Sequence, residues 1–340
     1  MQNRITQRGD LLDENGVLKH AGWAKSLLLD YDRAAIRASK FKIKEWDYYC
    51  ILTERHGVAF TIADNSYMSL IAVTVFDFDN AREISNSVML PFTMGSLHMP
   101  SSSESGDILF ENKKVSLKFL RQKESRKIEI DYVDFCDKKR LTGSIVLQQP
   151  DALESMVIAT PFPKNKLAFY YNQKINCMPA QGELRFGDKT LSFSPDTSFA
   201  VLDWGRGVWT YSNTWYWGSA SGEINGKSFG FNIGYGFGDT SKASENMLFH
   251  EGKAHKIDRV EFHIPEDDFL KPWKFSSNDA RFEMDFTPII DRHSNANLVL
   301  IKSTQHQVFG RFSGRAQLDS GEDIIVKDLL GFAEKVYNRW

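Results

Sequence analysis

Residues 203–222 (DWGRGVWTYSNTWYWGSASG) hold the side chains of this sequence that are best suited to chemistry. The stretch contains one carboxylate, Asp203, one guanidinium, Arg206, and several glycines. It also contains four of the eight tryptophans in the chain, Trp204, Trp209, Trp215 and Trp217. Indole rings bury a large apolar area, and a buried indole N–H needs a hydrogen-bond partner. A cluster this dense belongs to a core or to the wall of a pocket, and we expect a pocket that binds a ligand.

Asp203 is the candidate catalytic acid of this stretch. A carboxyl group beside buried indoles is desolvated, which raises its pKa and allows it to donate a proton near neutral pH. Aromatic faces can stabilise the carbocation that forms when a double bond is protonated. The alternative role is structural, an ion pair between Asp203 and Arg206 that fixes a turn. Arg206 is also suited to bind a carboxylate or phosphate of a ligand through two parallel hydrogen bonds.

Polar side chains outside this stretch are further candidates. Glu245 and His250 are candidate acid–base partners, although Glu245 is equally suited to brace a loop. Tyr171, Asn172 and Asn232 are candidate ligand-binding residues. The spacing of the acidic and histidine residues matches no metal-binding motif, so we expect no metal. No nucleotide-binding loop occurs, and the glycines of residues 230–238 are not followed by a helical pattern, so we expect no cofactor.

Composition narrows the class of protein. The 340 residues include 42 basic and 44 acidic ones without a basic block, which argues against a nucleic-acid partner. No apolar run reaches the length of a membrane-spanning helix, and the first residues lack the apolar region of a signal peptide. The three cysteines are far apart and odd in number, which is typical of a reducing compartment. We therefore expect a cytoplasmic protein whose partner is a small molecule.

The elements that position these residues are predicted to be β-strands. From Phe41 onward, apolar residues alternate with polar or small ones in many short runs, such as the run with Val58, Phe60 and Ile62 on one face. Turn signals rich in glycine, asparagine and aspartate separate the runs, and few helical patterns occur. The pattern predicts an all-β fold with antiparallel strands.

The same pattern occurs in both halves of the chain and predicts two β-barrels in tandem. We expect an entry segment over residues 1–40, a first barrel over residues 41–180 and a second barrel over residues 181–340. The ligand chamber is expected in the second barrel, which holds the tryptophan-rich stretch. The prolines of residues 160–179 indicate a connection between the halves rather than a central strand. From residue 324 onward, the sequence fits either an amphipathic helix or another strand.

Four longer strings resemble a known family. They are FYYNQKINCMP (residues 169–179), LDWGRGVW (202–209), WYWGSASG (215–222) and ENMLFHEGKAHKI (245–257). On these strings the chain is identified as a member of the bacterial domain-of-unknown-function family 2804, over most of its length. This family carries no established activity.

A more distant resemblance adds an expectation about fold and chemistry. The motif Asp203-Trp204-Gly205, followed by a strand with Trp215 and Trp217, is similar to the second half of carotenoid hydratase and hydroxyneurosporene synthase-like proteins. That resemblance implies two lipocalin-like barrels. It also implies acid-catalysed protonation or hydration of an isoprenoid double bond, with Asp203 in the position of the acid.

Three functional hypotheses follow. The first is a protein that binds a hydrophobic small molecule, such as a lipid or isoprenoid, in a barrel cavity. The second is an enzyme of the hydratase, isomerase or cyclase kind with Asp203 as the proton donor. The third is a protein that binds or processes carbohydrate, since indole faces stack on sugar rings. The position of Asp203 discriminates among them, because an enclosed apolar cavity favours the first two and an open groove favours the third.

Overall fold

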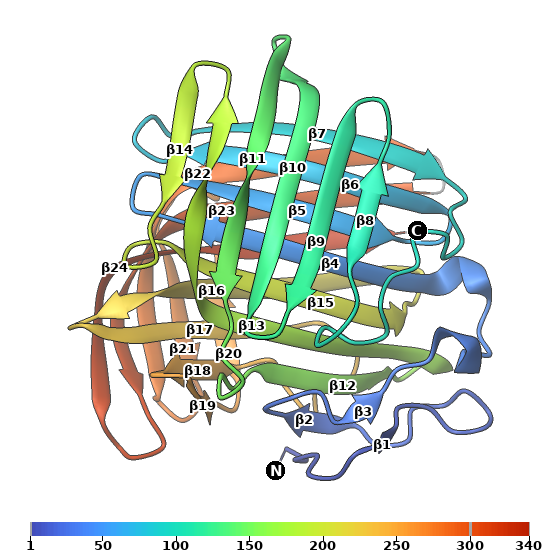
Figure 1. Ribbon diagram of the computed structural model, residues 1–340. Coiled ribbons are helices and arrows are strands. Elements are labelled where there is room, and N and C mark those ends of the chain that lie inside the picture. The colour runs from blue at the N-terminus through green and yellow to red at the C-terminus, as the bar shows by residue number, and fades with distance from the viewer. Residues whose placement is uncertain (1, 299–300, 340) are drawn as a thin grey trace.

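Runs of alternating side chains form strands along nearly the whole chain. The computed structural model describes residues 2–298 and 301–339, and the described elements are strands apart from two short 3-10 helices, Arg33–Ala35 and Lys40–Lys42 (Figure 1). The strands form two large antiparallel sheets and one small parallel pair, β1 (Gly9–Asp10) with β3 (Leu29–Asp30). The all-β prediction is confirmed, and the two curled antiparallel sheets are consistent with two tandem barrels.

The first sheet has 13 strands, with the main order β7-β6-β5-β4-β15-β13-β11-β10-β9-β8. Strand β12 pairs with β13 and β2, and β14 pairs with β13. The bounds are β2 (Gly22–Ala24), β4 (Ile43–Leu52), β5 (His56–Asp64), β6 (Met68–Asp77), β7 (Arg82–Pro91), β8 (Ile108–Glu111), β9 (Val115–Gln122), β10 (Ser125–Cys136), β11 (Lys139–Gln148), β12 (Met156–Phe162), β13 (Asn165–Phe186), β14 (Lys189–Phe193) and β15 (Phe199–Val208).

The second sheet has nine strands in the order β19-β18-β17-β16-β24-β23-β22-β21-β20. Its concave interior is filled by aromatic rings, among them Phe231, Phe286 and Phe312. The bounds are β16 (Ser212–Ile224), β17 (Lys227–Tyr235), β18 (Met247–His250), β19 (Lys253–Lys256), β20 (Val260–His263), β21 (Trp273–Ser277), β22 (Phe282–Leu298), β23 (Ile301–Gln317) and β24 (Asp323–Arg339).

The first sheet curls over itself, so that β8–β11 cross in front of β4–β7 (Figure 1). Large side chains of β4 and β5 point toward the folded-over strands β8–β11. Tyr49 of β4, for example, contacts Phe119 of β9 with ring centroids 4.7 Å apart. The opposite face of β4 packs against the second sheet, where the ring centroids of Tyr48 and Trp217 are 5.8 Å apart, and on the neighbouring β6 the ring centroid of Phe76 lies 4.2 Å from that of Phe309. Strands β4 and β5 are therefore buried on both faces, which explains their nearly continuous burial.

Strand β13 links the layers because it bends sharply at Asn176 and Cys177. Its first part pairs with β12 and β15, and its second part pairs with β11 and β14. Cys177 has a φ of 58°, and the register with β15 shifts at this point. The Asn176 amide donates to Ser219 Oγ at 2.8 Å and to the Phe231 carbonyl at 3.1 Å, both on the second sheet. The bend thus joins the two sheets through a buried amide.

One expectation about the chain's organisation needs correction, and one open alternative is decided. Residues 160–179 are not a connection but parts of β12 and of the central strand β13. The segment from residue 324 onward is a strand, β24, in the middle of the second sheet. The division into two barrels at residue 180 stays a prediction; residue 180 lies within β13, and the change from the first sheet to the second occurs between Val208 and Ser212. Long-range strand pairing overrides the local proline signal, because β12 lies near the sheet edge and tolerates Pro161.

The Asn176 contacts lead to a prediction about stability. Replacing Asn176 with Ala leaves buried acceptors on the second sheet without a donor, which is expected to lower the free energy of unfolding by about 1–3 kcal/mol. Urea denaturation measures this change. The control is Asn15→Ala, at an exposed turn position, and it is expected to change stability by less than about 0.5 kcal/mol. Equal effects of the two substitutions would show that Asn176 does not join the sheets.

Candidate functional site

A cavity of about 220 Å³ lies between the two sheets. Strands β4, β5, β6, β13 and β15 form one wall, and β16, β22, β23 and β24 form the opposite wall. Both sheets therefore build this cavity, and it includes part of the tryptophan-rich stretch for which a ligand chamber was expected. The aromatic side chains that line it are Trp46, Tyr48, Tyr170, Trp209, Trp215, Trp217 and Phe237, and the charged ones are Lys44, Lys174, Asp203, Arg292 and Glu334.

Small residues on the first sheet make room for this cavity and for its large rings. On β5 and β6, the side chains that line the cavity include Thr61, Ala63 and Ala72. Gly205 of β15 lies opposite Trp46, and a Cβ atom at position 205 would lie 2.1 Å from the indole ring. The first glycine of the DWGRGVW motif is thus explained by the bulk of the facing tryptophan, whereas a Cβ atom at Gly207 would lie 2.4 Å from the Phe169 carbonyl oxygen.

Asp203 lies on the cavity face of β15, in a buried ion pair with Lys174 of β13. The Lys174 Nζ atom is 2.8 Å from Asp203 Oδ1, and the Asn172 amide donates to the same oxygen at 2.6 Å. No hydrogen bond from the residues described here reaches the other oxygen, Oδ2. Lys174 Nζ also lies 3.9 Å from the centroid of the Trp217 ring, a cation–π contact. Two donors therefore fix Asp203 while one oxygen remains available to a ligand.

The predicted ion pair between Asp203 and Arg206 does not form. Alternate side chains of a strand point to opposite faces, so positions 203 and 206 of β15 are on different sides. Arg206 is fully buried on the face of β15 that points away from the cavity. There it pairs with Asp47 at 3.0 Å and donates to the Pro100 carbonyl. Trp204 lies on that side as well, with the Arg206 guanidinium 4.4 Å from its ring centroid. Both residues support the core of the first sheet rather than the cavity.

Glu334 is the titratable group whose environment best suits proton donation, and the sequence did not reveal it. Burial raises the pKa of Glu334 from 4.5 to about 7, and the nearby Asp203 charge also raises it. The Trp215 indole N–H donates to Glu334 Oε1 at 3.0 Å, and the Gln307 amide donates to Oε2 at 3.0 Å. The available signal was the alternation Leu330, Phe332, Glu334, in which one acid occupies an apolar face of a strand. We missed it because the segment also fitted a helix.

Glu245 lies one layer behind the cavity wall. The Tyr170 hydroxyl, whose ring lines the cavity, donates to Glu245 Oε1 at 2.8 Å. Burial raises the pKa of Glu245 above its usual range, and Lys174 partly opposes this shift. Asn232 accepts from the Trp217 indole N–H at 2.7 Å and donates to the Glu245 carbonyl. Glu245 and Asn232 therefore hold Tyr170 and Trp217 in place from behind.

Two other candidates lie away from the cavity. His250 is at the end of β18, opposite Phe229 of β17 and Lys253 of β19, and it does not line the cavity. Tyr171 points to the other side of β13 from Tyr170, and its hydroxyl donates to the Leu29 carbonyl. Of the predicted site residues, the structure brings Asp203, Trp209, Trp215 and Trp217 into the cavity wall.

Lys44 adds a second group that titrates near neutral pH. Burial lowers the pKa of Lys44 to about 7, although the Asp64 carboxylate opposes the shift. Its Nζ atom donates to the Asn65 carbonyl at 2.8 Å and lies 4.1 Å from the Tyr67 ring centroid. The cavity therefore contains an amine and a carboxylic acid that both change charge near pH 7.

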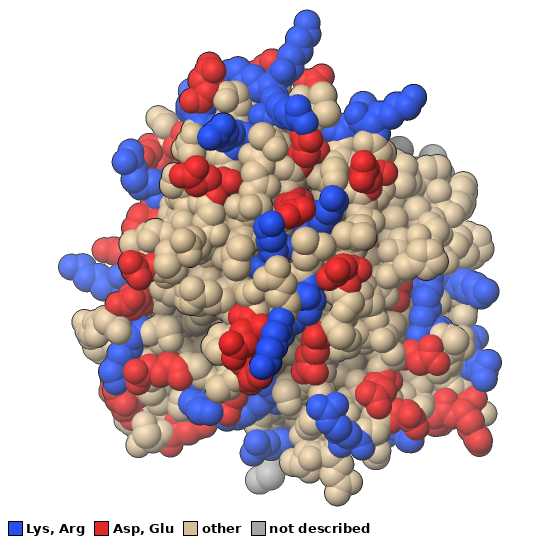
Figure 2. Space-filling model, in the orientation of Figure 1, with Lys and Arg blue, Asp and Glu red and all other residues tan. Residues whose placement is uncertain are grey.

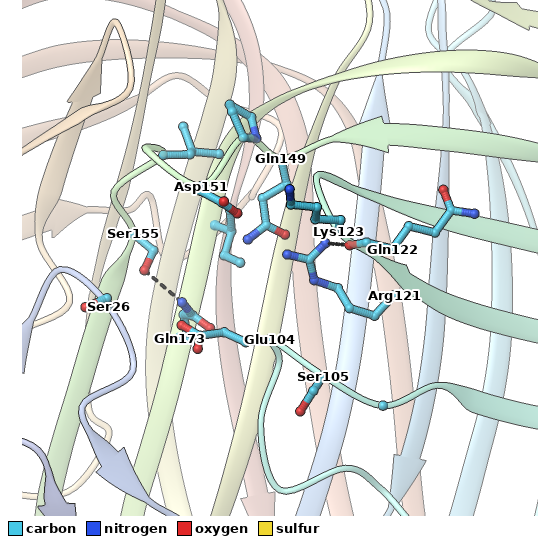
Figure 3. A pocket seen from close by; sticks show the side chains of 14 residues that line it. Ser26, Glu104, Ser105, Arg121, Gln122, Lys123, Gln149, Asp151, Ser155 and Gln173 are labelled. Atoms are coloured by element: carbon cyan, nitrogen blue, oxygen red, sulfur yellow. Dashed lines mark hydrogen bonds between the residues drawn. The ribbon is translucent and has the colours of Figure 1, made fainter.

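A second cavity, of about 580 Å³, lies on the other side of β13 (Figure 3). Gln173 borders it, and its amide donates to Ser155 Oγ at 2.8 Å. Arg121 and Lys123 are accompanied there by Glu104 and Asp151, so both signs of charge are present. The strands in front of this region also carry interspersed acidic and basic side chains (Figure 2). This cavity lacks the aromatic wall of the cavity that contains Asp203.

Other classes of site were sought in the described part of the chain. No group of three or more His, Cys, Asp or Glu residues there is arranged to hold a metal ion. Across residues 2–298 and 301–339, no helix has the length and apolarity of a membrane-spanning helix. The three cysteines are free, and Cys50 and Cys177 are buried.

The fold and the cavity define a protein of two curled β-sheets with an aromatic, charged cavity between them. The chain belongs to the family described as a domain of unknown function, DUF2804, which matches residues 2–340. No protein with a curated description matches the sequence.

Solved structures with similar folds are distant in sequence. CghA in complex with Sch210972 is 10% identical, with a TM-score of 0.56, and the match covers 98% of this chain and 97% of CghA. Kievitone hydratase from Nectria haematococca is also 10% identical, with a TM-score of 0.54 and the same coverage. A candidate AttH from Nitrosomonas europaea is 11% identical, with a TM-score of 0.53, and the match covers 90% of this chain and 96% of that protein. These similarities show a shared fold.

Gly205 allows a direct test of the packing at the cavity wall. The substitution Gly205→Ala forces the Trp46 ring to move, which is expected to destabilise the protein by about 1–3 kcal/mol and to shift the tryptophan emission spectrum. Thermal unfolding and fluorescence measure both effects. Gly9→Ala is the matched control, because nothing lies within 4 Å of a Cβ atom there. An unchanged unfolding temperature for Gly205→Ala would contradict the close approach of Trp46.

The raised pKa of Glu334 predicts a pH dependence of stability. Because the folded-state pKa of about 7 exceeds the ordinary value of 4.5, the contribution of protonated Glu334 is complete below pH 4.5 and is lost as pH rises through 7. The loss is expected to be on the order of 2–3 kcal/mol. Urea denaturation at pH 5 and pH 8 is expected to show a smaller change for Glu334→Gln than for the unsubstituted protein. The exposed control Glu322→Gln is expected to retain the full change.

Proposed function

We propose that this protein is an enzyme that protonates a carbon–carbon double bond of a small, largely apolar substrate, as hydratases, isomerases and cyclases do. The observation that carries the proposal is Glu334, a buried carboxyl group with a pKa of about 7 in the wall of an aromatic cavity. A general acid works best when its pKa is near the working pH. The cavity volume of about 220 Å³ suits a small substrate or the reacting end of a longer one.

In this proposal Glu334 takes the acid role that the sequence suggested for Asp203. The Glu334 proton moves to one carbon of the double bond, and the positive charge develops on the other carbon. The indole and phenol rings of the wall face this cation and stabilise it. The Glu334 carboxylate that remains is stabilised by the Trp215 N–H and the Gln307 amide, which already donate to its oxygens.

Asp203 is proposed to act as the base on the opposite wall. Its carboxylate, oriented by Lys174 and Asn172, accepts a proton either from a water that attacks the cation or from a neighbouring carbon. The first route adds water, and the second moves the double bond. Two carboxyl groups in unlike environments, one in an ion pair and one held by neutral donors, are the usual arrangement for separate acid and base roles.

Binding of a hydrophobic ligand without turnover is the second candidate, because the aromatic wall supports affinity whether or not chemistry follows. Carbohydrate binding has less support. The tryptophans pack against one another, with interplanar angles of 65° for Trp46 and Trp209 and 69° for Trp209 and Trp215, rather than as flat platforms along an open groove. The name of one structural relative, a hydratase, and the small-molecule complex of another agree with the enzyme proposal by analogy of fold.

The enzyme proposal predicts incorporation of deuterium into carbon. The protein is incubated in deuterium oxide with a small isoprenoid alcohol such as geraniol, and mass spectrometry detects carbon-bound deuterium in any product or recovered substrate. Glu334→Gln and Asp203→Asn are each expected to slow incorporation by about 10²–10⁴-fold while still binding geraniol. The rate is expected to fall as pH rises above about 7, because Glu334 then loses its proton.

The control for this experiment is Glu322→Gln, an exposed carboxyl group in the turn between β23 and β24 that does not line the cavity, and this variant is expected to incorporate deuterium at the full rate. Incorporation that persists in Glu334→Gln would remove Glu334 from the acid role. Binding without incorporation in the unsubstituted protein would favour the second candidate function.

A further inference from the structure

Arg292 is a cavity residue that the proposed reaction does not use. It projects from β22 beside Gln307 of β23, and its Nη1 atom donates to Gln307 Oε1 at 3.0 Å. The other end of the Gln307 side chain donates from Nε2 to Glu334 Oε2, also at 3.0 Å. Gln307 thus separates the guanidinium from the carboxyl group and fixes both.

Arg292 has no carboxylate partner of its own within the described chain. Glu334 cannot readily serve as one, because Gln307 and Trp215 already donate to its two oxygens. The neighbouring Asp291 lies on the other face of β22, where it pairs with His306 at 2.7 Å. A guanidinium has five N–H donors, so one hydrogen bond to an amide leaves most of them directed at other acceptors, such as solvent or a ligand.

The cations that line the cavity outnumber the acids that line it, although Lys44 also interacts with the Asp64 carboxylate. The cations are Lys44, Lys174 and Arg292, and the acids are Asp203 and Glu334. The Asp203 charge is taken up by Lys174. Arg292 is half-buried and forms no ion pair within the described chain, so its free N–H groups can exchange solvent for the carboxylate of a ligand.

We propose that the ligand of this cavity is a small unsaturated carboxylic acid, whose carboxylate binds Arg292 and whose apolar body lies against the indole rings. The inference rests on the proposed function, since it identifies the substrate class of the same cavity. An arginine is suited to this task because its planar fork matches the two oxygens of a carboxylate. The arrangement places the acid group of the ligand one amide away from Glu334, so that the double bond next to it meets the proton donor.

A matched pair of probes tests the proposal. Geranic acid and geraniol share an apolar body and differ in the presence of the carboxylate. Quenching of tryptophan emission, which Trp215 and Trp217 in the wall would report, measures binding of each at pH 6 in the full-length protein. Geranic acid is expected to bind about 10–100-fold more tightly than geraniol, in line with a charged hydrogen-bonded pair.

The same pair is then measured on variants. Arg292→Met is expected to reduce the preference for the acid to about twofold or less without weakening geraniol binding, and Arg292→Lys to retain part of it. The control is Arg315→Met, whose guanidinium pairs with Asp323 on the surface and which is expected to retain the full preference. Equal affinity for the two probes, or an unchanged preference in Arg292→Met, would overturn the proposal.

Glu334→Gln separates this test from that of the proposed function. The acid preference is expected to persist in that variant, because the amide oxygen of a glutamine can still accept from Gln307, which holds Arg292, while the amide cannot donate an acidic proton. Acid-selective binding without deuterium incorporation would refute the catalysis and leave the substrate class standing. The opposite outcome has two parts: Arg292→Met does not change deuterium incorporation into geraniol, and the protein shows no preference for geranic acid. That outcome would refute the substrate class and leave the catalysis standing.

Discussion

The burial of β4, β13 and β15 on both faces is the constraint on which the rest of this structure depends. One face packs against the folded-over strands of the first sheet, and the other packs against the second sheet. A charged side chain in such a strand has no access to bulk water and must be compensated within the protein. Arg206 pairs with Asp47 on one side, and Lys174 pairs with Asp203 on the other. The two pairs divide the tryptophan-rich stretch into a structural face and a cavity face.

The cavity exists because the two sheets meet with unequal side chains. Both sheets contribute rings, but the small alanine and threonine side chains come from the first sheet, and the polar group of Glu334, Gln307 and Arg292 comes from the second. Neither sheet holds the complete set of charges. The low polarity of the ring-lined wall accounts for both the raised pKa of Glu334 and the lowered pKa of Lys44, since burial disfavours the charged form of each.

The distant structural relatives show that this two-sheet fold persists at 10–11% identity. A fold maintained at that level is held by period-two alternation and packing, and many different side chains satisfy both. In the proposed function, the chemistry therefore depends on the few residues that face the space between the sheets. In this chain those residues are Glu334, which accepts from neutral donors, Asp203, which pairs with a lysine, and Arg292.

The sequence by itself determined the all-β class and the faces of single strands. Period-two alternation is local, so it already places Trp215 and Trp217 on one face, whereas the separation of Asp203 from Arg206 followed only once both residues were found in one strand, β15. Only the tertiary structure decided which faces meet. Lys174 reaches Asp203 because β13 pairs with β15, and Glu334 reaches Trp215 because β24 enters the centre of the second sheet. Glu334 and Trp215 are more than 100 residues apart in the sequence, and they meet because their strands pack side by side. No local pattern encodes that pairing.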